Sequence, residues 1–392
     1  MATTSLPHQL KIAARSRIAP FIAMDVLARA NAHAAQGRDV IHLEVGEPGR
    51  GAPAAVLDAA RRALEAGAIG YTEALGRPAL RAAIAEHYRR SYDIALASER
   101  AIVTVGASGA FVLSFLALFD PGDRVVVPEP AFPAYKNILE ALGIEVVRIG
   151  LGPDTRFKPT VAMLEAVPPP VHGLIVASPA NPTGTMLDRS ELAAIAAFCR
   201  GRNIRLIADE IYHGITYEEP ARTVLELDPD AVVINGFSKY FCIPGWRLGW
   251  LIVPPDLVRP IELLAQNLFI SPPALAQEAA LAAFACRDEL DRRVETYRRS
   301  RAALLERLPR GGLDRFAPVD GAFYLYADVS HLTGDSHDLC TRILEATGVA
   351  LTPGADFDGE NGHRYLRLAF AGDPDQVVRG ADRLIDWLGS RT

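Results

Sequence analysis

Residues 231–254 read AVVINGFSKYFCIPGWRLGWLIVP, two apolar runs on either side of a segment with one lysine and one arginine. The runs AVVIN (231–235) and GWLIVP (249–254) have the length and β-branched content of buried strands. Between them, Lys239 and Arg247 stand among aromatic side chains and glycines. A cation in apolar surroundings is costly without a partner, so the segment indicates a binding site between two strands.

Similar strand-like runs precede this segment, and helix-length patterns separate them. The runs are AIVTV (101–105), RVVVP (124–128), GLIVAS (173–178) and IRLIAD (204–209), with helices expected at 108–119, 133–142 and 188–201. Regular alternation of strands and helices is typical of a mostly parallel sheet with helices on both faces. The sequence therefore predicts an α/β fold.

The pattern changes near residue 271. The later elements are a long charged helical stretch to about residue 308, strand-like GAFYLYADVS (321–330) and YLRLAF (365–370), and helices near 336–347 and from 374. We therefore expect a large domain over residues 46–285 and a smaller α+β domain made from both chain ends, residues 1–45 and 286–392. The N-terminal part contributes an amphipathic helix expected at 18–36.

The composition is that of a globular protein without nucleic-acid or membrane partners. Of the 392 residues, 49% are hydrophobic and 22% are charged, which is usual for globular domains. The net charge is −6 and the pI is near 5.9, so no basic excess attracts nucleic acid or anionic lipid. No apolar run approaches the roughly 20 residues of a membrane span.

The four cysteines indicate a reducing compartment. They stand at 199, 242, 286 and 340 without a C-x-x-C pair, which disfavours a disulfide framework and a structural zinc site. The N-terminal residues contain few acids but lack the long apolar region of a signal peptide. We therefore expect a cytoplasmic protein without a bound metal.

Small and polar residues follow three of the predicted strands. Residues 106–109 (GASG) lead into a helix, whose free amides suit a phosphate, although a plain tight turn has the same composition. Asn181 precedes Pro182, which favours extended backbone and an amide directed into a cleft; an ordinary N-P-T-G turn is the alternative. Asp209 ends a buried strand, with Tyr212 three residues later. Such a carboxylate needs a cation or a hydrogen-bond donor, unless it caps a helix.

Taken together, these residues match one ligand. A lysine among apolar neighbours has a lowered pKa and becomes an amine nucleophile, and an arginine is suited to hold a phosphate. Pyridoxal 5′-phosphate requires an amine for its aldehyde, a cation for its phosphate, an acid for its ring nitrogen and a phenol. Lys239, Arg247, Asp209 and Tyr212 supply these groups.

The chain resembles the class I/II aminotransferases of the aspartate-aminotransferase-like superfamily, which are fold type I pyridoxal-phosphate enzymes. The matching segments are LEVGEPG (43–49), GYTEALGRPALR (70–81), NPTG (181–184), DEIY (209–212), FSKYFCIPGWRLGW (237–250) and YLRLAF (365–370). They span nearly the whole chain in the family's order and spacing. The ordered set is far more specific than any one segment.

The resemblance implies roles for the residues around the cofactor ring. Lys239 would bind the aldehyde and then shuttle a proton between substrate and cofactor. Asp209 would pair with the ring nitrogen, and Tyr212 and Asn181 would hydrogen-bond the phenolic oxygen. Phe132 would stack on the ring.

The resemblance also implies how phosphate and substrate are held. The implied phosphate-binding groups are Ala107, Ser108, Ser238 and Arg247. Tyr71 would reach the phosphate from the other subunit, so a homodimer with shared active sites is expected. Arg367 would bind the substrate α-carboxylate through a bidentate pair, assisted by Asn181 and the backbone at Gly46.

Two positions depart from the family pattern. Gly236 stands where many relatives have a serine, so one phosphate hydrogen bond is missing or replaced by water. Phe132 stands where the stacking residue is often tryptophan, which reduces the contact area but keeps an aromatic face.

The implied activity is ping-pong transfer of an amino group between an L-amino acid and a 2-oxo acid. A carbon–sulfur β-lyase is an alternative, because the same lysine, aspartate and arginine serve that reaction. A non-catalytic pyridoxal-phosphate-binding regulator is a second alternative. Residues 1–45 are too short for the separate DNA-binding domain of such regulators, and the sequence contains no basic recognition helix.

The amino donor is expected to be neutral. Arg367 accounts for one carboxylate, so a dicarboxylic donor needs a second cation. The two segments expected near the donor side chain are 266–277, which has no basic residue, and 17–24, which has only Arg17. Burying an unpaired carboxylate there would cost roughly several kcal/mol. Alanine, leucine or methionine should therefore be better donors than aspartate.

Overall fold

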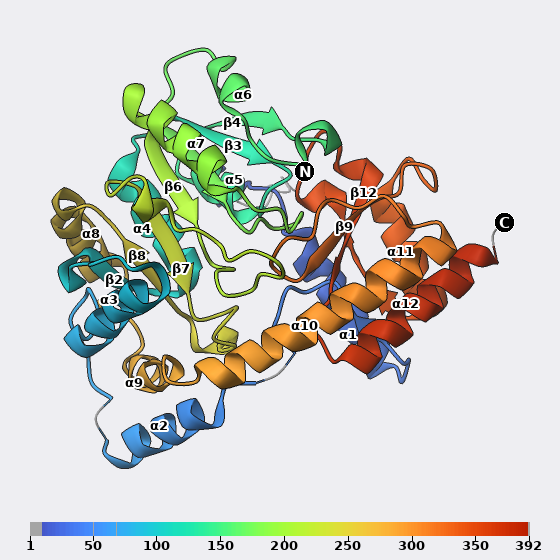
Figure 1. Cartoon of the computed structure of the whole chain (residues 1–392), viewed down its shortest axis with the longest axis horizontal. Helices are drawn as coiled ribbons and strands as arrows, with labels where there is room; N and C mark the ends of the chain where they lie inside the picture. The colour runs from blue at the N-terminus through green and yellow to red at the C-terminus, as the bar shows by residue number, and fades with distance from the viewer. Residues whose placement is uncertain (1–9, 50, 68, 391–392) are drawn as a thin grey trace, which may run out of the picture.

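The computed structural model describes residues 10–49, 51–67 and 69–390. Its largest sheet has seven strands in the order β2-β8-β7-β6-β5-β3-β4 (Figure 1). Only the pairs that include β8 are antiparallel, so the predicted mostly parallel α/β sheet is confirmed. The strands are β2 (Ala101–Val105), β3 (Arg124–Glu129), β4 (Glu145–Gly150), β5 (Gly173–Ala177), β6 (Arg205–Asp209), β7 (Val232–Gly236) and β8 (Leu248–Ile252).

Both faces of this sheet are buried. Neighbouring residues along a strand point to opposite faces, and accordingly Val126 and Leu174 belong to one apolar cluster while Val125 and Ile175 belong to another. Helices supply many of the other residues of both clusters. They are α2 (Ala54–Glu65), α3 (Pro78–Tyr92), α4 (Gly106–Leu118), α5 (Ala134–Ala141), α6 (Val161–Glu165), α7 (Arg189–Gly201), α8 (Pro255–Leu268) and α9 (Ala274–Ala283).

The two ends of the chain meet beside the large sheet (Figure 1). β1 (Ile41–His42) pairs with β10 (Val349–Ala350), and β11 (Thr352–Pro353), β12 (Tyr365–Ala369) and β9 (Tyr324–Asp328) form a separate antiparallel sheet. The helices around these strands are α1 (Ile22–Ala35), α10 (Arg287–Arg307), α11 (Ser336–Thr347) and α12 (Pro374–Gly389). Ile41 and Leu43 share an apolar cluster with the strands near the C-terminus.

Three expectations about these elements were wrong in detail. The sequence analysis missed β4, an edge strand whose residues are mostly exposed or half-buried and therefore lack an apolar run. The long helical stretch is divided into α9 and α10, because the alanine-rich α9 buries several of its residues while α10 is strongly charged. The helix expected from residue 18 begins at Ile22, since Pro20 disfavours helical backbone at the residue before it.

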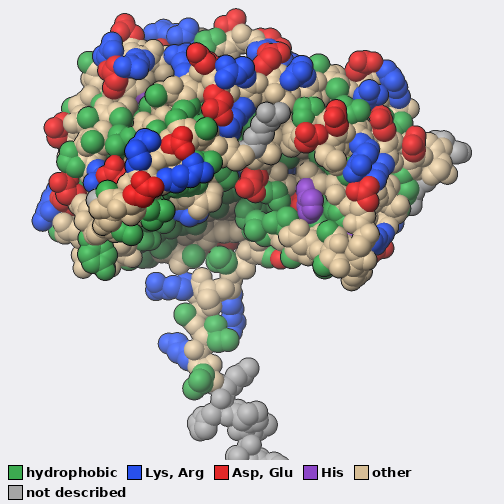
Figure 2. Space-filling view, turned by 90° about the horizontal axis from the view of Figure 1, so that it is seen from below, with side chains coloured by type: hydrophobic (Ala, Val, Ile, Leu, Met, Phe, Trp, Pro, Cys, Tyr) green, Lys and Arg blue, Asp and Glu red, His purple; other side chains and the backbone are tan. Residues whose placement is uncertain are grey.

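Most of residues 10–20, before α1, project from the body, although the carbonyl oxygen of Ala19 accepts a hydrogen bond from Nδ2 of Asn137 at 3.3 Å. Residues 10–20 are exposed, and the space-filling view shows them projecting from the body beside a hollow surrounded by hydrophobic side chains (Figure 2). Arg17 lies in this exposed segment. Across residues 10–49, 51–67 and 69–390, no helix has both the length and the apolar character that crossing a membrane requires.

Candidate active site

A cavity of about 540 Å³ lies at the carboxyl ends of the parallel strands, where the large sheet meets the elements from the chain ends. The predicted site residues that line it are Gly46, Ala107, Ser108, Phe132, Asn181, Asp209, Tyr212, Ser238, Lys239, Arg247 and Arg367. Tyr71 is not among the residues that line this cavity, and it is 85% exposed on the outside of the chain. The structure thus brings together residues that are up to about 320 positions apart. Asn181, Asp209 and Lys239 lie at or beyond the ends of parallel strands, which meet at one edge of the sheet, whereas Arg367 comes from the separate antiparallel sheet.

Lys239 follows β7 and extends into the cavity. Its Nζ donates a hydrogen bond to the carbonyl oxygen of Gly46 and lies 5.8 Å from the ring centroid of Tyr212. Burial, followed by the positive charge of Arg367, lowers the pKa of the Lys239 amine to about 8. A larger fraction of this amine is therefore uncharged at neutral pH than of an ordinary lysine, which makes it a usable nucleophile.

Asp209 is the last residue of β6 and is buried. One carboxylate oxygen accepts a hydrogen bond from the Ile211 amide at 3.1 Å, and the other accepts one from the hydroxyl of Tyr135. Burial raises the pKa of Asp209 to about 6. No lysine or arginine in the described parts of the chain lies within ion-pair distance of it. The cavity therefore offers a buried carboxylate that a cationic ring nitrogen would stabilise.

The N-terminus of α4 and Arg247 together form a positively charged corner. Gly106 has a φ of +67°, and a Cβ on it would lie 2.4 Å from Nη2 of Arg247, so only a glycine allows the guanidinium this close to the helix end. The next residues, Ala107 and Ser108, carry first-turn amides of α4, which have no partners within a helix. The helix dipole adds a partial positive charge there. This corner is suited to bind a phosphate.

The departure at Gly236 has a packing reason. Gly236 of β7 pairs with Gly249 of β8, and a Cβ on Gly236 would lie 3.0 Å from the Cα of Gly249. A Cβ on Gly249 would in turn lie 2.6 Å from the amide nitrogen of Ala107. The two glycines therefore let the strands and the start of α4 approach one another beside the positively charged corner.

Arg367 lies in β12 and is buried. Its Nη1 donates to Oδ1 of Asn181 at 2.8 Å, and its Nη2 donates to the carbonyl oxygen of Glu44. The guanidinium lies over the rings of Tyr324 and Phe357, with distances of 4.4 and 4.6 Å to the ring centroids. Its Nε is buried and has no hydrogen-bond partner. A guanidinium held between two rings, without a carboxylate partner among the described residues, is suited to bind the carboxylate of a substrate.

Three further residues at the cavity were not identified from the sequence. Tyr135 donates to Asp209, and the Tyr324 hydroxyl lies 2.7 Å from that of Tyr212. A Cβ on Gly46 would lie 1.8 Å from the hydroxyl oxygen of Tyr324, so Gly46 is required for this tyrosine to enter. Glu47 also lines the cavity. Tyr135 stands three residues after Phe132, in the first turn of α5, and this proximity to Phe132 in the sequence was the available signal for it.

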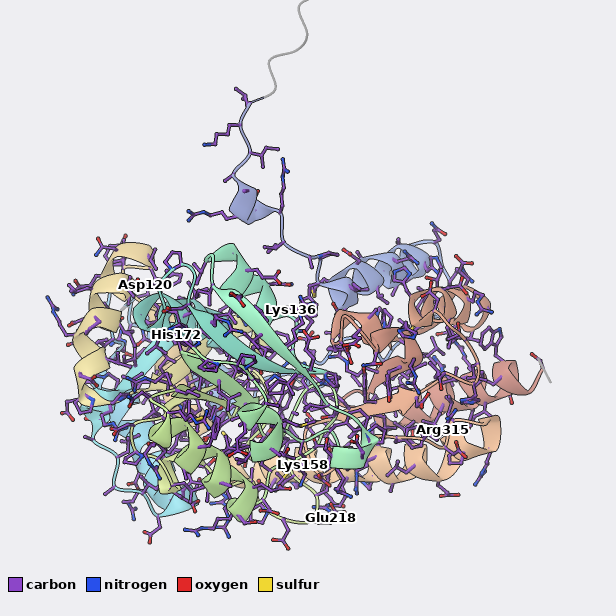
Figure 3. The ribbon with its side chains drawn as sticks, turned by 90° about the horizontal axis from the view of Figure 1, so that it is seen from above. Asp120, Lys136, Lys158, His172, Glu218 and Arg315 are labelled. Atoms are coloured by element: carbon purple, nitrogen blue, oxygen red, sulfur yellow. The ribbon has the colours of Figure 1, made fainter. Side chains whose placement is uncertain are left out.

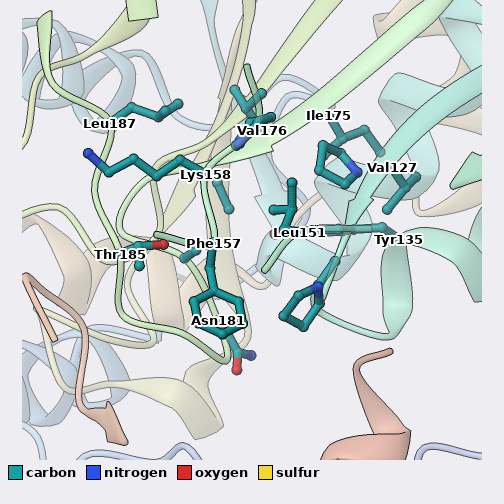
Figure 4. Close-up of a pocket in the computed structure, with 16 residues that line it drawn as sticks. Val127, Tyr135, Leu151, Phe157, Lys158, Ile175, Val176, Asn181, Thr185 and Leu187 are labelled. Carbon is teal, nitrogen blue, oxygen red and sulfur yellow. The ribbon is translucent and has the colours of Figure 1, made fainter. Parts of the chain in front are cut away.

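A second, smaller cavity of about 30 Å³ lies next to the large cavity (Figure 4). Tyr135 and Asn181 line both cavities, and most of the other residues around the small cavity are apolar, including Val127 and Ile175. The volume is enough for about one water molecule. Tyr135 and Asn181 therefore form the partition between the two spaces.

The sequence family described as aminotransferase class I and II matches residues 38–384. The chain belongs to this family. It is a pyridoxal-phosphate-dependent aminotransferase, and the cavity fits that cofactor. Lys239 would provide the amine, Asp209 would provide a buried carboxylate without an ion-pair partner in the described residues, and Gly106 leaves room for the guanidinium of Arg247 beside the start of α4.

Known aminotransferases resemble the chain over nearly its full length. A valine–pyruvate aminotransferase of Mycobacterium tuberculosis is 47% identical over 97% of this chain and 99% of the relative. The crystal structure of an aminotransferase from Mycobacterium tuberculosis superposes with a TM-score of 0.95 at 46% identity, covering 97% of this chain and 100% of that one. The structure of an aspartate aminotransferase from Thermus thermophilus with maleate has a TM-score of 0.92 at 33% identity, with coverages of 96% and 100%.

Proposed function

We propose that this aminotransferase moves amino groups by ping-pong transfer between neutral L-amino acids and 2-oxo acids. The observation that carries the proposal is the charge of the cavity wall. Its basic residues are Lys239, Arg247 and Arg367, as far as the structure describes the chain, and Glu47 contributes a negative charge. The three cations are already required for the cofactor aldehyde, the phosphate and the α-carboxylate.

The side of the cavity formed by α1 is apolar. Phe21, Met24 and Leu27 line the cavity there. A second carboxylate placed against these half-buried and exposed apolar side chains and near Glu47 would have no cationic partner among the described residues, which disfavours a dicarboxylic donor. An apolar donor side chain would instead gain roughly 25 cal/mol for each Å² removed from water. The relative with 47% identity is named for valine and pyruvate, which supports an aliphatic donor and pyruvate as an acceptor.

The roles of the central residues follow from their chemistry. When bound, pyridoxal 5′-phosphate supplies an aldehyde that condenses with amines and a ring that withdraws electrons from the substrate Cα–H bond. Lys239 supplies the amine that holds the aldehyde and moves the proton from Cα. Asp209 keeps the ring nitrogen protonated, and Tyr135 fixes the orientation of its carboxylate. Tyr212 and Asn181 hydrogen-bond the phenolic oxygen, and Phe132 covers one face of the ring.

The cofactor phosphate is proposed to lie in the corner between α4 and Arg247. The groups that hold it are the amides of Ala107 and Ser108 together with the side chains of Ser238 and Arg247. Arg367 binds the substrate α-carboxylate, assisted by Asn181, with which it is already hydrogen-bonded, and by the backbone at Gly46.

A homodimer with shared active sites is proposed, with Tyr71 reaching the phosphate of the partner. Tyr71 is 85% exposed, and Ile69 and Ile270 beside it are 49% and 54% exposed. Thr72 and Ser271 are hydrogen-bonded, which brings these side chains into one patch. Large apolar side chains gathered on a surface are suited to contact a second copy.

The domain organisation and the location in the cell are also proposals. We propose residues 46–285 as the large domain, and residues 1–45 and 286–392 as the small domain. Pairing of β1 with β10 supports the union of the two chain ends. Four free cysteines, all buried, support a cytoplasmic location.

The test of the donor class is a comparison of kcat/KM for L-aspartate, L-alanine, L-valine, L-leucine and L-methionine, with 2-oxobutanoate as the common acceptor, because its product differs from every donor. We expect the neutral amino acids to exceed aspartate by at least about tenfold, the factor that corresponds to 1.4 kcal/mol. A preference for aspartate would refute the proposal and would require a cation from outside the described cavity wall.

A further inference from the structure

Helix α1 begins without a capping side chain of its own. The residue before it is Phe21, which cannot accept a hydrogen bond from the first turn. The two oxygens of Asp356 do so instead, accepting from the amides of Ile22 at 2.9 Å and Ala23 at 3.0 Å. Asp356 is 2% exposed and lies more than 300 residues further along the chain. The start of α1 is therefore fixed by a tertiary contact.

The helix that Asp356 holds is the apolar wall of the active site. Met24 and Leu27 line the cavity one and two turns into α1, and Phe21 lines it at the beginning. The ring of Phe21 meets that of Phe132 edge to face, with 5.7 Å between centroids. Figure 3 shows α1 beside the helices near the C-terminus, with the preceding residues extending away from the body. Movement of the first turn would change the space left for a donor side chain.

The segment that carries Asp356 also supports the carboxylate-binding arginine. Thr352 Oγ1 accepts from Nη2 of Arg367 at 3.4 Å, and the Phe357 ring lies under the same guanidinium. The carbonyl oxygen of Phe357 accepts from the amide of Ala131, next to Phe132. One short segment, residues 352–357, thus contacts the arginine, the aromatic wall and the start of α1. Through these contacts, the segment positions Arg367, the aromatic residues beside Ala131 and the first turn of α1 relative to one another.

We propose that Asp356 is a positioning residue for the amino donor. Its carboxylate fixes the distance between the first turn of α1 and Arg367, and this distance leaves room for an apolar donor side chain. Asp356 thereby determines the selectivity for donors with larger side chains over donors with smaller ones. The proposal rests on the neutral-donor function above. Asp356 itself contacts neither the cofactor nor the reacting atoms, because both of its carboxylate oxygens accept from the two amides of α1.

The test compares Asp356→Ala with a matched cap variant. Asp373 is the local N-cap of α12, and its Oδ1 accepts from the amides of Asp375 at 3.0 Å and Gln376 at 3.3 Å; α12 does not line the cavity. Both alanine variants remove the acceptor at a helix N-terminus. The melting temperature should fall further in Asp356→Ala, because Asp356 is buried whereas Asp373 is exposed. Asp356→Asn keeps one acceptor oxygen but directs an NH2 group at the second amide, so it should restore only part of the wild-type behaviour.

The first readout is binding of two unreactive carboxylates to the cofactor-loaded protein by calorimetry. We expect the ratio of the two dissociation constants, for propanoate and for 4-methylpentanoate, to fall about tenfold in Asp356→Ala. This factor is the lower end of the discrimination that one methylene group gives in an apolar pocket. We expect no change in Asp373→Ala. For amino donors, KM for leucine should rise in Asp356→Ala while kcat changes less, and KM for alanine should stay near wild type.

The second readout is amide hydrogen exchange, which does not depend on turnover. Asp356→Ala should accelerate exchange in the first turn of α1, whereas Asp373→Ala should accelerate it at α12. An unchanged preference in Asp356→Ala, with or without faster exchange, would overturn the proposal. Absence of any preference for 4-methylpentanoate in the wild-type protein would also overturn the proposal, whereas tighter binding of succinate than of either compound would overturn the neutral-donor function.

Discussion

Replacement of Gly106 by alanine should weaken cofactor binding while leaving the fold intact. Gly106 has a φ of +67°, and the new Cβ would lie 2.4 Å from Nη2 and 2.9 Å from Cζ of Arg247. A left-handed backbone costs an alanine about 1–2 kcal/mol. The clash itself is with the far end of a flexible side chain, so the guanidinium will swing away. The fold is therefore little destabilised, and the phosphate corner is left without its arginine.

The size of the effect follows from the hydrogen bonds that the guanidinium can no longer donate to the phosphate. A hydrogen bond to a charged group contributes about 1.5–3 kcal/mol, so affinity for pyridoxal 5′-phosphate should fall by about 10- to 100-fold. Gly109→Ala in the same helix is the control, because its Cβ would meet Val105 at 3.5 Å, an ordinary contact. Titration of both apoproteins with the cofactor, followed by absorbance, gives the two dissociation constants. Equal affinities for the two variants would refute the phosphate site at this corner.

Three other changes test the remaining roles. Asp209→Ala should slow removal of the substrate Cα proton by about 100- to 1,000-fold, the usual loss for a positioned electrostatic group. Asp209→Glu should slow this step less. Normal turnover of Asp209→Ala in stopped-flow assays would exclude the role of Asp209. The protein should sediment as a dimer, and Tyr71→Phe should weaken cofactor binding by ~1–2 kcal/mol, whereas an active monomer would contradict the shared site. The pKa of Lys239 is lowered to about 8 by burial and then by Arg367, so its amine loses its proton as the pH rises through 8. Capture of cofactor by the apoprotein should accelerate over that range and then level off, and acceleration that continued to pH 10 would indicate an unperturbed lysine.

The sequence predicted the central strands and most of the site for related reasons. Strands buried on both faces appear as short β-branched runs, and the residues that follow them meet at one edge of a parallel sheet. Asn181 and Asp209 could therefore be assigned to a common site before their distance was known. Lys239 was identified by the contrast between its charge and its apolar neighbours. The order of the matching segments indicated the aminotransferase family, and the family match over residues 38–384 confirms it.

The features that the sequence did not predict depend on contacts between distant residues or on packing. The edge strand β4 is largely exposed and has no distinctive apolar run. The contacts of Tyr135 with Asp209, Tyr324 with Tyr212 and Asp356 with Ile22 join residues that are far apart in the chain. No periodicity or spacing encodes such pairs. Each is determined by the fold that brings the two side chains together.

The most direct test of amino transfer uses the two half-reactions separately. The cofactor-loaded protein is mixed with L-alanine alone, and pyruvate, ammonia and the cofactor absorbance are measured; a second 2-oxo acid is then added. We predict one pyruvate per active site, no ammonia, and recovery of the starting absorbance with formation of the corresponding amino acid. The Lys239→Ala variant should give none of these changes. Repeated turnover with release of ammonia in the absence of an acceptor, or full activity of Lys239→Ala, would contradict the account.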